Sequence, residues 1–326
     1  MLLMTKKYRM FWTGGLDSSF RLTQLAQRKN VEIYPVYVIF PWRLSTDEEI
    51  KRHTIFREWL ERTGKVQAVI HPVEYVTAEK DLIADPEVVR SIRWVSEQYQ
   101  GFGEYDHLST YARLHPGVEL CIPWNPPGHE IPIIRIIDKS LGGLRVDDEG
   151  IGWVDDPEDK AHEVKLAVGN FSYPLAKIRN WDYEPILQSQ GFDFAEFISR
   201  TWSCYSPFHG DRCGICRSCR GKLAHVPYMK KYYSSASQRR NKLWLSLGEK
   251  DEPVVNTMFY VGTTSQREMA MTLRHTLLVK QEQVYEKALQ KFKLAGNVLG
   301  IAKATEELER IRDKRAKYWK LLEEVS

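Results

Sequence analysis

Apolar runs alternate with amphipathic segments along the first part of the chain. Residues 8–12 form an apolar stretch that predicts a buried strand, and residues 20–26 have the apolar spacing of a helix. Residues 31–40 then predict a second strand, residues 47–62 a second helix, and residues 66–70 a third strand. Strands that alternate with helices predict a parallel sheet with helical crossover connections. We therefore expect an α/β fold class with a doubly wound parallel sheet, whose ligands bind beyond the carboxyl ends of the strands.

Polar residues mark the ends of the second predicted helix, and the middle of the chain carries fewer signals. Thr46 and Glu49 have the spacing of a capping box, which predicts the start of this helix, and Gly64 predicts its end. Residues 81–125 are predicted to be mostly helical. Residues 126–172 contain Pro-Pro-Gly, a Gly-Gly pair and a short acidic run, so we expect irregular structure there.

Helical spacing of apolar residues returns beyond residue 250. A first set comprises Leu273, Leu277, Val284, Ala288 and Phe292. A second set follows a nearly regular heptad and comprises Ile301, Ala304, Leu308, Ile311, Tyr318, Leu322 and Val325. With Asn297 near the turn between the two sets, the pattern predicts a helical hairpin. This hairpin is either an added layer over the core or a docking arm for a protein partner or for a second copy in a homodimer.

The composition is that of a globular protein with one substantial core. The chain has 326 residues, of which 43% are hydrophobic, and a formal net charge of +4 from 47 basic and 43 acidic residues. So small a surplus does not by itself indicate nucleic-acid binding. No apolar run approaches the length that spans a membrane, and Met1 to Lys7 leave no room for a signal peptide before the first strand. We expect a cytoplasmic protein with no membrane segment.

Positive charge is concentrated in one stretch of the chain. No acidic residue lies between Arg212 and Lys242, and tyrosines are interleaved with the basic side chains. The basic residues of this stretch are Arg212, Arg217, Arg220, Lys222, Lys230, Lys231, Arg239, Arg240 and Lys242. The stretch is either a solvated basic helix or a surface that binds nucleic acid or an acidic partner.

The segment between the first strand and the first helix has the chemistry of a phosphate-binding turn. It comprises Thr13, Gly14, Gly15, Leu16, Asp17, Ser18 and Ser19. Two adjacent glycines let the backbone approach a ligand closely, while hydroxyl groups and the N–H groups of the helix start can face an anion. A carboxylate at Asp17 suits a Mg²⁺ ion that bridges it to phosphates, so Mg²⁺-bound ATP is the expected ligand. The segment lacks the lysine of a Walker loop and the glycine spacing of a dinucleotide fold; the alternative is an ordinary glycine turn with a serine-rich helix cap.

Four cysteines lie close together in a later part of the sequence. Their spacing, Cys-x8-Cys-x2-Cys-x2-Cys, allows four thiolates to converge on one tetrahedral Zn²⁺. The four are Cys204, Cys213, Cys216 and Cys219. Disulfide bonds are the alternative, which a cytoplasmic location disfavours. Because four protein ligands leave no position for a substrate, we expect a structural zinc site. Cys121 stands apart and is predicted to be a core residue.

The glycine turn resembles the pyrophosphate loop, Ser-Gly-Gly-x-Asp-Ser, of the PP-loop ATP pyrophosphatases, whose fold is of the HUP type. Thr13 stands where that family usually has serine, which keeps the hydroxyl group. The resemblance implies that the turn binds the outer phosphates of ATP, with Asp17 and Ser18 as catalytic residues. It further implies that AMP is transferred to the substrate while pyrophosphate leaves.

A second resemblance is narrower. Residues 201–205, Thr-Trp-Ser-Cys-Tyr, and residues 213–220, Cys-Gly-Ile-Cys-Arg-Ser-Cys-Arg, are similar to the zinc segment of the 7-cyano-7-deazaguanine synthase family. Tyr173-Pro174-Leu175 and Gly191-Phe192 also match features that precede the first zinc cysteine in that family. The resemblance implies ATP, Mg²⁺ and Zn²⁺ as cofactors and a deazaguanine carboxylate as substrate. In that family the carboxylate of 7-carboxy-7-deazaguanine is adenylated, ammonia displaces AMP to give an amide, and a second ATP-dependent step gives the nitrile.

The middle of the chain departs from the synthase pattern. The Pro-Gly-Arg-Asn segment of the family has no match, and the Asp-Lys pair expected after Leu175 is missing. Lys177 and Arg179 lie near that position and are our candidates for binding the substrate carboxylate; otherwise they are ordinary surface residues.

These patterns divide the chain into three predicted parts. Residues 1–203 form the PP-loop α/β domain, residues 204–250 the zinc segment and basic helix, and residues 251–326 the helical hairpin. Two further functions stay open. Relatives of the synthase occur in bacterial antiphage systems of CBASS or Qat type, in which the activated deazaguanine would be joined to a protein amine. Alternatively, the basic stretch binds or modifies RNA and the ATP turn is vestigial.

Overall fold

The computed structural model divides the chain into two compact units. The first comprises Met1–Tyr205 and Arg217–Tyr232, and the second comprises Ser206–Cys216 and Tyr233–Ser326. The residues that the structure describes are 5–41, 43, 45–98, 104–125, 132–154, 162–205, 207, 212, 218–219, 222–223, 227–235, 237–238, 282–283, 285–287, 289–294 and 298–325.

A mixed, mostly parallel sheet forms the centre of the first unit. Its strands are β1 (Lys6–Phe11), β2 (Val31–Ile39), β3 (Val69–Ile70), β4 (Glu74–Thr77), β5 (Val118–Glu119), β6 (Leu144–Val146), β7 (Gly152–Val154) and β8 (Phe171–Tyr173). Their order is β3-β2-β1-β5-β8-β7-β6, and β4 also pairs with β2. All pairs from β3 to β8 are parallel, whereas β7 runs antiparallel to both β8 and β6. The sheet is therefore parallel where it carries the glycine turn and antiparallel at one edge.

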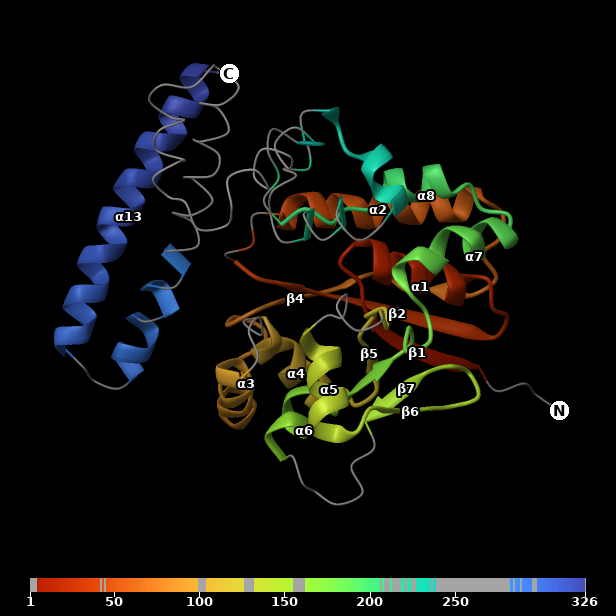
Figure 1. Ribbon diagram of the computed structural model, residues 1–326, viewed down its shortest axis with the longest axis horizontal. Helices are drawn as coiled ribbons and strands as arrows, with labels where there is room; N and C mark the ends of the chain where they lie inside the picture. Colours follow the sequence, from red (N-terminus) through yellow and green to blue (C-terminus); the bar gives the residue numbers. More distant parts are fainter. Residues whose placement is uncertain are drawn as a thin grey trace. The chain divides into compact units, whose positions relative to one another are not determined.

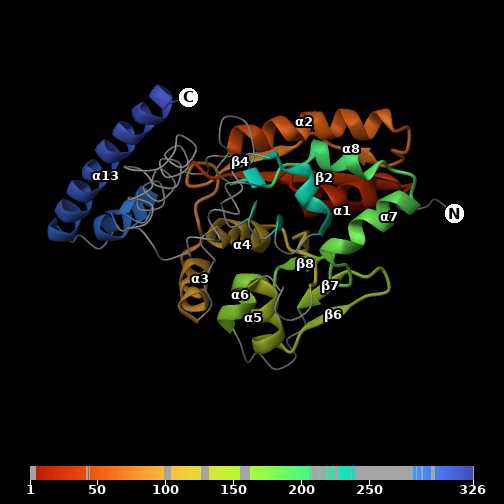
Figure 2. The ribbon, with the colours of Figure 1, turned by 45° about the horizontal axis from the view of Figure 1, so that its top comes forward.

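Helices cover both faces of the sheet, as Figures 1 and 2 show. One face carries α1 (Leu16–Ala26), α2 (Thr46–Arg62), α7 (Tyr183–Ser189) and α8 (Phe194–Arg200). The other carries α3 (Pro86–Gln98), α4 (Tyr105–Leu114), α5 (Pro132–Leu141) and α6 (His162–Val168). The prediction of an α/β class is confirmed, and the arrangement is compatible with a doubly wound fold.

Aromatic side chains fill the interior between these layers. Phe56 and Trp59 of α2 pack against Phe197 of α8, with ring centroids 5.6 and 6.0 Å from that of Phe197. In a separate cluster, the ring of Phe11 in β1 lies 5.4 Å from that of Tyr111 in α4. Burial of such side chains is the main driving force for assembly of the two helical layers on the sheet.

The prediction of irregular structure for residues 126–172 is wrong for the described residues of this range. They form α5, α6, β6, β7 and the start of β8. In α5, Ile133, Ile134, Ile136 and Ile137 are at most 1% exposed. Pro132 begins α5, and Gly142 and Gly143 follow its last residue, so these residues mark the ends of a short element.

The predicted strand at residues 66–70 is present but shorter, since it covers only Val69–Ile70.

The predicted capping box of α2 is also wrong. Ser45 is the N-cap residue, and Thr46 is the first residue of the helix, where its hydroxyl donates to the carbonyl of Arg43. Glu49 reaches back to the N-cap residue, but to its side chain: the buried carboxylate accepts hydrogen bonds from the hydroxyl groups of Ser45 and Tyr37. Tertiary contacts with β2 thus decide the position of this side chain.

The second unit contains α13 (Val298–Val325), and the described residues between 282 and 294 are helical as well. Arg312 of α13 pairs with Glu282 and Glu286, each at 2.7 Å. Ala304, Leu308 and Ile311 are buried. These contacts are those of two helical segments that pack against each other. Leu273, Leu277, Val284 and Ala288, which belong to the first set of the predicted hairpin, lie outside the described residues.

Within the part of the chain that the structure describes, no helix is both long and apolar enough to cross a membrane.

Candidate functional site

A cavity of about 220 Å³ opens in the first unit at the carboxyl ends of the central strands. Phe11 at the end of β1, Val38 of β2 and Leu120 just after β5 contribute to its walls. The glycine turn lies at this edge because it directly follows β1. Ligands of open α/β sheets bind in this position, beyond the carboxyl ends of parallel strands.

The turn presents most of its predicted ligand-binding residues to the cavity. Its lining members are Thr13, Gly15, Leu16, Asp17 and Ser18. The Thr13 hydroxyl accepts from the N–H of Gly15 at 3.3 Å, and Ser18 Oγ accepts from the N–H of Thr13 at 3.4 Å. Gly15 is the N-cap residue of α1, so this helix begins at the cavity. A helix N-terminus carries partial positive charge and N–H donors that suit an anion.

Gly14 and Ser19 face away from the cavity and support the turn. Gly14 adopts φ of +67°, and a Cβ atom added there would lie 3.0 Å from Cβ of Arg52. The Ser19 hydroxyl is fully buried and accepts from the indole N–H of Trp12 at 3.0 Å. Both residues thus fix the backbone of the turn, because Gly14 packs against α2 and Ser19 bonds to Trp12, which directly follows β1.

Asp17 is held by residues that are distant in the sequence. The hydroxyl of Tyr183 donates to Oδ1 of Asp17 at 2.9 Å, and the Tyr183 ring stacks on Phe20 at 4.1 Å between centroids. Lys222 Nζ lies 3.8 Å from Oδ2 of Asp17, and the Lys222 side chain is only 12% exposed. Lys222 also lines the cavity. Sequence analysis placed this lysine in the basic stretch and missed its position beside the turn.

A second group in the cavity wall combines charged side chains with an aromatic ring. The guanidinium of Arg43 lies between two carboxylates, 3.5 Å from Glu49 and 3.1 Å from Glu104. It also lies 5.0 Å from the ring centroid of Tyr205. Burial raises the pKa of Glu49, an effect that Arg43 and the hydroxyl of Tyr37 oppose. Sequence reasoning missed this group, because its members come together only in the folded chain.

The segment that carries the first and last of the four cysteines forms one wall of the cavity. The backbone N–H of Trp202 donates to the carbonyl of Gly14 at 2.8 Å, and the indole N–H of Trp202 donates to the carbonyl of Cys204 at 2.9 Å. Ser203 and Ser218, which adjoin Cys204 and Cys219, line the cavity. The cysteine segment is therefore bonded directly to the glycine turn.

The structure tests the predicted zinc ligands only in part. Cys204 and Cys219 are fully buried, as thiolate ligands of a structural metal would be. Cys213 and Cys216 lie outside the described residues. Among the described residues, no group of three or more metal-ligating side chains is found. The zinc site stays a prediction.

Two predicted substrate residues do not reach the cavity. Lys177 and Arg179 are both exposed, and neither lines its wall. Arg179 is the N-cap residue of a 3₁₀-helix, η1 (Asn180–Asp182), and its guanidinium pairs with Asp182 at 2.9 Å. The structure therefore does not bring these two side chains to the cavity.

Cys121 is not a core residue as predicted. It is partly exposed and lines the cavity just beyond β5. Burial raises the pKa of its thiol well above the usual value, and the nearby carboxylate of Glu119 acts in the same direction. The group is therefore a neutral thiol near pH 7 and a poor nucleophile.

No family model, no curated protein and no solved structure matches the chain.

Proposed function

We propose that the chain is an ATP-dependent adenylating ligase of the 7-cyano-7-deazaguanine synthase type. The observation that carries this proposal is the hydrogen bond from Trp202 to Gly14, at 2.8 Å. Two segments far apart in the sequence resemble one family, and they form adjacent walls of one cavity. A chance likeness of two unrelated surface segments gives no reason for them to meet at one site.

The proposed reaction begins at the α-phosphorus of ATP. A carboxylate oxygen of the substrate attacks this atom, and the bond to the β-phosphate oxygen breaks, so pyrophosphate leaves. A nitrogen nucleophile then attacks the carbonyl carbon of the acyl-adenylate, and AMP leaves with the carboxylate oxygen. Adenylation thus converts a poor leaving group, oxide, into a good one.

The residues of the turn bind and orient the phosphates in this reaction. The N–H groups at the start of α1 and the hydroxyls of Thr13 and Ser18 face the cavity and can donate to phosphate oxygens. Asp17 would hold a Mg²⁺ ion, which supplies positive charge against the departing pyrophosphate. The cysteines would hold a structural Zn²⁺ that keeps residues 202–205 against the turn.

The part of the cavity wall around Arg43 suits a flat heterocycle with N–H groups. Tyr105 and Tyr205 also line the cavity, and Glu104 offers a carboxylate that is about half exposed. The glycine turn supplies the N–H and hydroxyl donors for phosphate, so ATP would place its phosphates there. The N–H groups of a deazaguanine ring can donate hydrogen bonds to the carboxylate of Glu104.

Pyrophosphate exchange tests the proposed function. With ATP, Mg²⁺ and 7-carboxy-7-deazaguanine, labelled pyrophosphate should enter ATP only when the acid is present, because formation of the adenylate is reversible. Asp17→Asn should lose this exchange, whereas Asp148→Asn, at an exposed position in the turn between β6 and β7, should keep it. Exchange that is absent from the wild-type protein, or that does not depend on the acid, contradicts the proposal.

A second candidate function differs only in the nucleophile. The second unit adds two packed helical segments, joined by Arg312 and its two glutamates, which a synthase domain ending near residue 250 does not need. These segments could present a protein amine in place of ammonia. Intact mass of a co-expressed candidate partner decides this, since conjugation adds the mass of the deazaguanine acyl group.

Binding of RNA by the stretch from Arg212 to Lys242 stays a prediction. Two of its lysines face carboxylates of the first unit, since Lys222 lies beside Asp17 and Lys231 lies 3.7 Å from Glu184.

A further inference from the structure

The glycine turn has no lysine of its own, yet the folded chain places one beside it. Lys222 comes from the segment just after Cys219, and its ammonium lies 3.8 Å from the carboxylate of Asp17. Its side chain is 12% exposed and lines the same cavity as Thr13 and Ser18. A lysine that is withdrawn from solvent at this depth requires a compensating negative charge.

Asp17 alone does not fully meet this requirement. An ammonium–carboxylate hydrogen bond is normally about 2.7–2.9 Å long, so the distance of 3.8 Å indicates a loose ion pair. Asp17 also accepts from Tyr183 at 2.9 Å, which fixes one of its oxygens. The ammonium group of Lys222, which lines the cavity, can therefore still donate hydrogen bonds to a ligand.

The other charges of the cavity wall cannot serve the phosphates. Among the described residues, the charged side chains that line the cavity are Asp17, Arg43, Glu49, Glu104 and Lys222. Arg43 is paired with both Glu49 and Glu104, so its charge is already balanced by two carboxylates. Lys222 is thus the described lining cation that lies beside a residue of the glycine turn, Asp17. A triphosphate with its negative charge at the turn needs such a partner, most of all when charge grows on departing pyrophosphate.

We propose that Lys222 is a ligand of the outer phosphates of ATP, and that it stabilises pyrophosphate as the α-phosphorus is attacked. The proposal rests on the proposed function, because it assigns a role within the same site. The glycine turn would orient the phosphates through N–H groups, and Lys222 would supply the point charge that a Walker loop carries within its own sequence. Its position three residues after Cys219 makes the cysteine segment a part of the nucleotide site.

The affinities of Lys222 variants for ATP and for AMP show whether Lys222 binds the outer phosphates or only supports the structure, because AMP lacks those phosphates. We measure binding of both nucleotides, with Mg²⁺, by calorimetry for the wild-type protein, Lys222→Met, Lys222→Arg and Lys231→Met. Lys231 is a matched control, because it belongs to the same basic stretch and pairs with a carboxylate at 3.7 Å, but it is 59% exposed and does not line the cavity.

Lys222→Met should weaken ATP binding by about tenfold or more, since a hydrogen bond to a charged group is lost, and should leave AMP binding within about twofold. Lys222→Arg should recover part of the ATP affinity, and Lys231→Met should match the wild type. Equal weakening of ATP and AMP would show a structural role and overturn the proposal, as would unchanged ATP affinity in Lys222→Met.

Failure of the proposed function would look different. A wild-type protein that binds ATP but supports no acid-dependent pyrophosphate exchange refutes the adenylating activity, while the ratio of ATP to AMP affinity still decides the role of Lys222. A wild-type protein that binds no ATP refutes both.

Discussion

At the scale of single residues, Gly14 is a position of the turn where a side chain cannot be accommodated without strain. Its φ of +67° lies in the left-handed region, and a Cβ atom there would lie 3.0 Å from Arg52 Cβ and 3.3 Å from the carbonyl oxygen of Glu49. We predict that Gly14→Ala lowers the free energy of unfolding by about 1–3 kcal/mol and abolishes ATP binding, because the turn must move away from α2. Urea unfolding and calorimetry measure the two effects.

Gly64 offers a matched control for this substitution. It has the same φ of +67°, but a Cβ atom there would meet nothing within 4 Å. Gly64→Ala should therefore cost only the backbone strain, about 1 kcal/mol, and leave ATP binding unchanged. If Gly14→Ala behaved like Gly64→Ala in both measurements, the close approach of the turn to α2 would be needed neither for stability nor for ATP binding.

His53, which lies next to the glycine turn, should make the stability of the protein depend on pH. It is 2% exposed and lies behind Gly14, with its ring 4.5 Å from that of Trp12, and burial lowers its pKa to about 4. In the unfolded chain this histidine takes up a proton below about pH 6.5, whereas in the folded chain it stays neutral down to about pH 4. The free energy of unfolding should therefore be highest above pH 6.5 and fall as the pH drops towards 4. The loss should reach roughly 3 kcal/mol.

Unfolding by urea between pH 7 and pH 4.5 measures this loss, with His53→Gln as the comparison. The variant cannot take up the proton, so its stability should fall less steeply than that of the wild type. Parallel pH profiles for the two proteins would exclude His53 as a source of acid sensitivity.

The sequence predicts the turn well but the rest of the cavity poorly. Thr13 to Ser18 are contiguous, and glycine, hydroxyl and carboxylate groups at a strand end carry their chemistry locally. Lys222, Arg43 and Glu104 belong to segments that meet only through the fold, so no local pattern marks them. Lys177 and Arg179 follow a strand closely in the sequence, yet both are exposed and neither lines the cavity. A position near a strand end therefore does not by itself place a side chain in the site.

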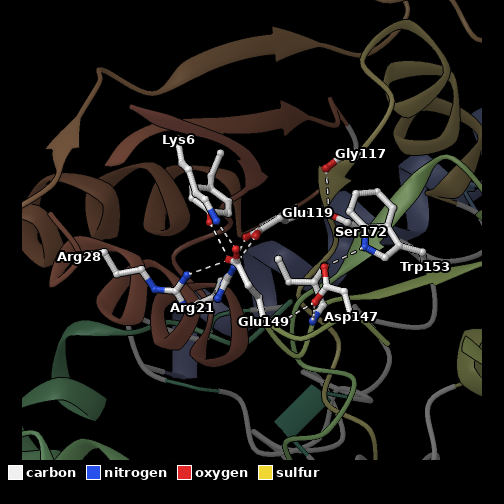
Figure 3. Close-up of polar contacts among 11 residues, drawn as sticks. Lys6, Arg21, Arg28, Gly117, Glu119, Asp147, Glu149, Trp153 and Ser172 are labelled. Carbon is white, nitrogen blue, oxygen red and sulfur yellow. Dashed lines mark hydrogen bonds and ion pairs between the residues drawn. The ribbon is translucent and has the colours of Figure 1, made fainter. Parts of the chain in front are cut away.

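At the scale of elements, a buried ion pair joins α1 to β5. Arg21 and Glu119 are 3% and 2% exposed, and Nε of Arg21 donates to Glu119 at 2.9 Å (Figure 3). We predict that Glu119→Gln lowers the free energy of unfolding by about 3–5 kcal/mol, because it leaves the buried guanidinium without a counter-charge. Denaturant titration measures the change.

Glu149 is the matched control for this ion pair. It lies in the turn between β6 and β7 and contacts Lys6 and Arg28, as Figure 3 shows. It also accepts from the hydroxyl of Tyr8, but its side chain is 36% exposed. Glu149→Gln should cost less than about 1 kcal/mol despite its larger number of partners, because solvent screens them. A similar cost for both variants would mean that burial does not set the strength of these pairs.

The cysteine segment gives a second prediction at this scale. We expect the purified protein to contain about one zinc per chain, and its removal by a chelator to weaken ATP binding. The reason is the direct hydrogen bond from Trp202 to Gly14, together with Lys222 in the cavity wall. Elemental analysis and calorimetry check this, and unchanged ATP affinity in metal-free protein would contradict it.

At the scale of the whole molecule, the prediction of a parallel sheet is confirmed for the strands β3-β2-β1-β5-β8, whereas β7 and β6 make the sheet a mixed one. Residues 126–172 were harder to predict, because β6, β7 and β8 have only three residues each and show little periodicity. α5 was predictable in principle, since its isoleucines recur at helical spacing, but the surrounding glycines and prolines obscured it.

The first unit brings together the glycine turn, the residues around Cys204 and Cys219, and a cavity that they line together with Arg43, Glu49 and Glu104. This arrangement leads to the central claim, transfer of AMP to a carboxylate. The most direct measurement supplies 7-carboxy-7-deazaguanine labelled with ¹⁸O in its carboxylate, together with ATP, Mg²⁺ and ammonia, and determines by mass spectrometry where the label goes. We predict AMP that carries one ¹⁸O atom, along with unlabelled pyrophosphate. Label in inorganic phosphate, accompanied by ADP, would show phosphoryl transfer and contradict adenylation.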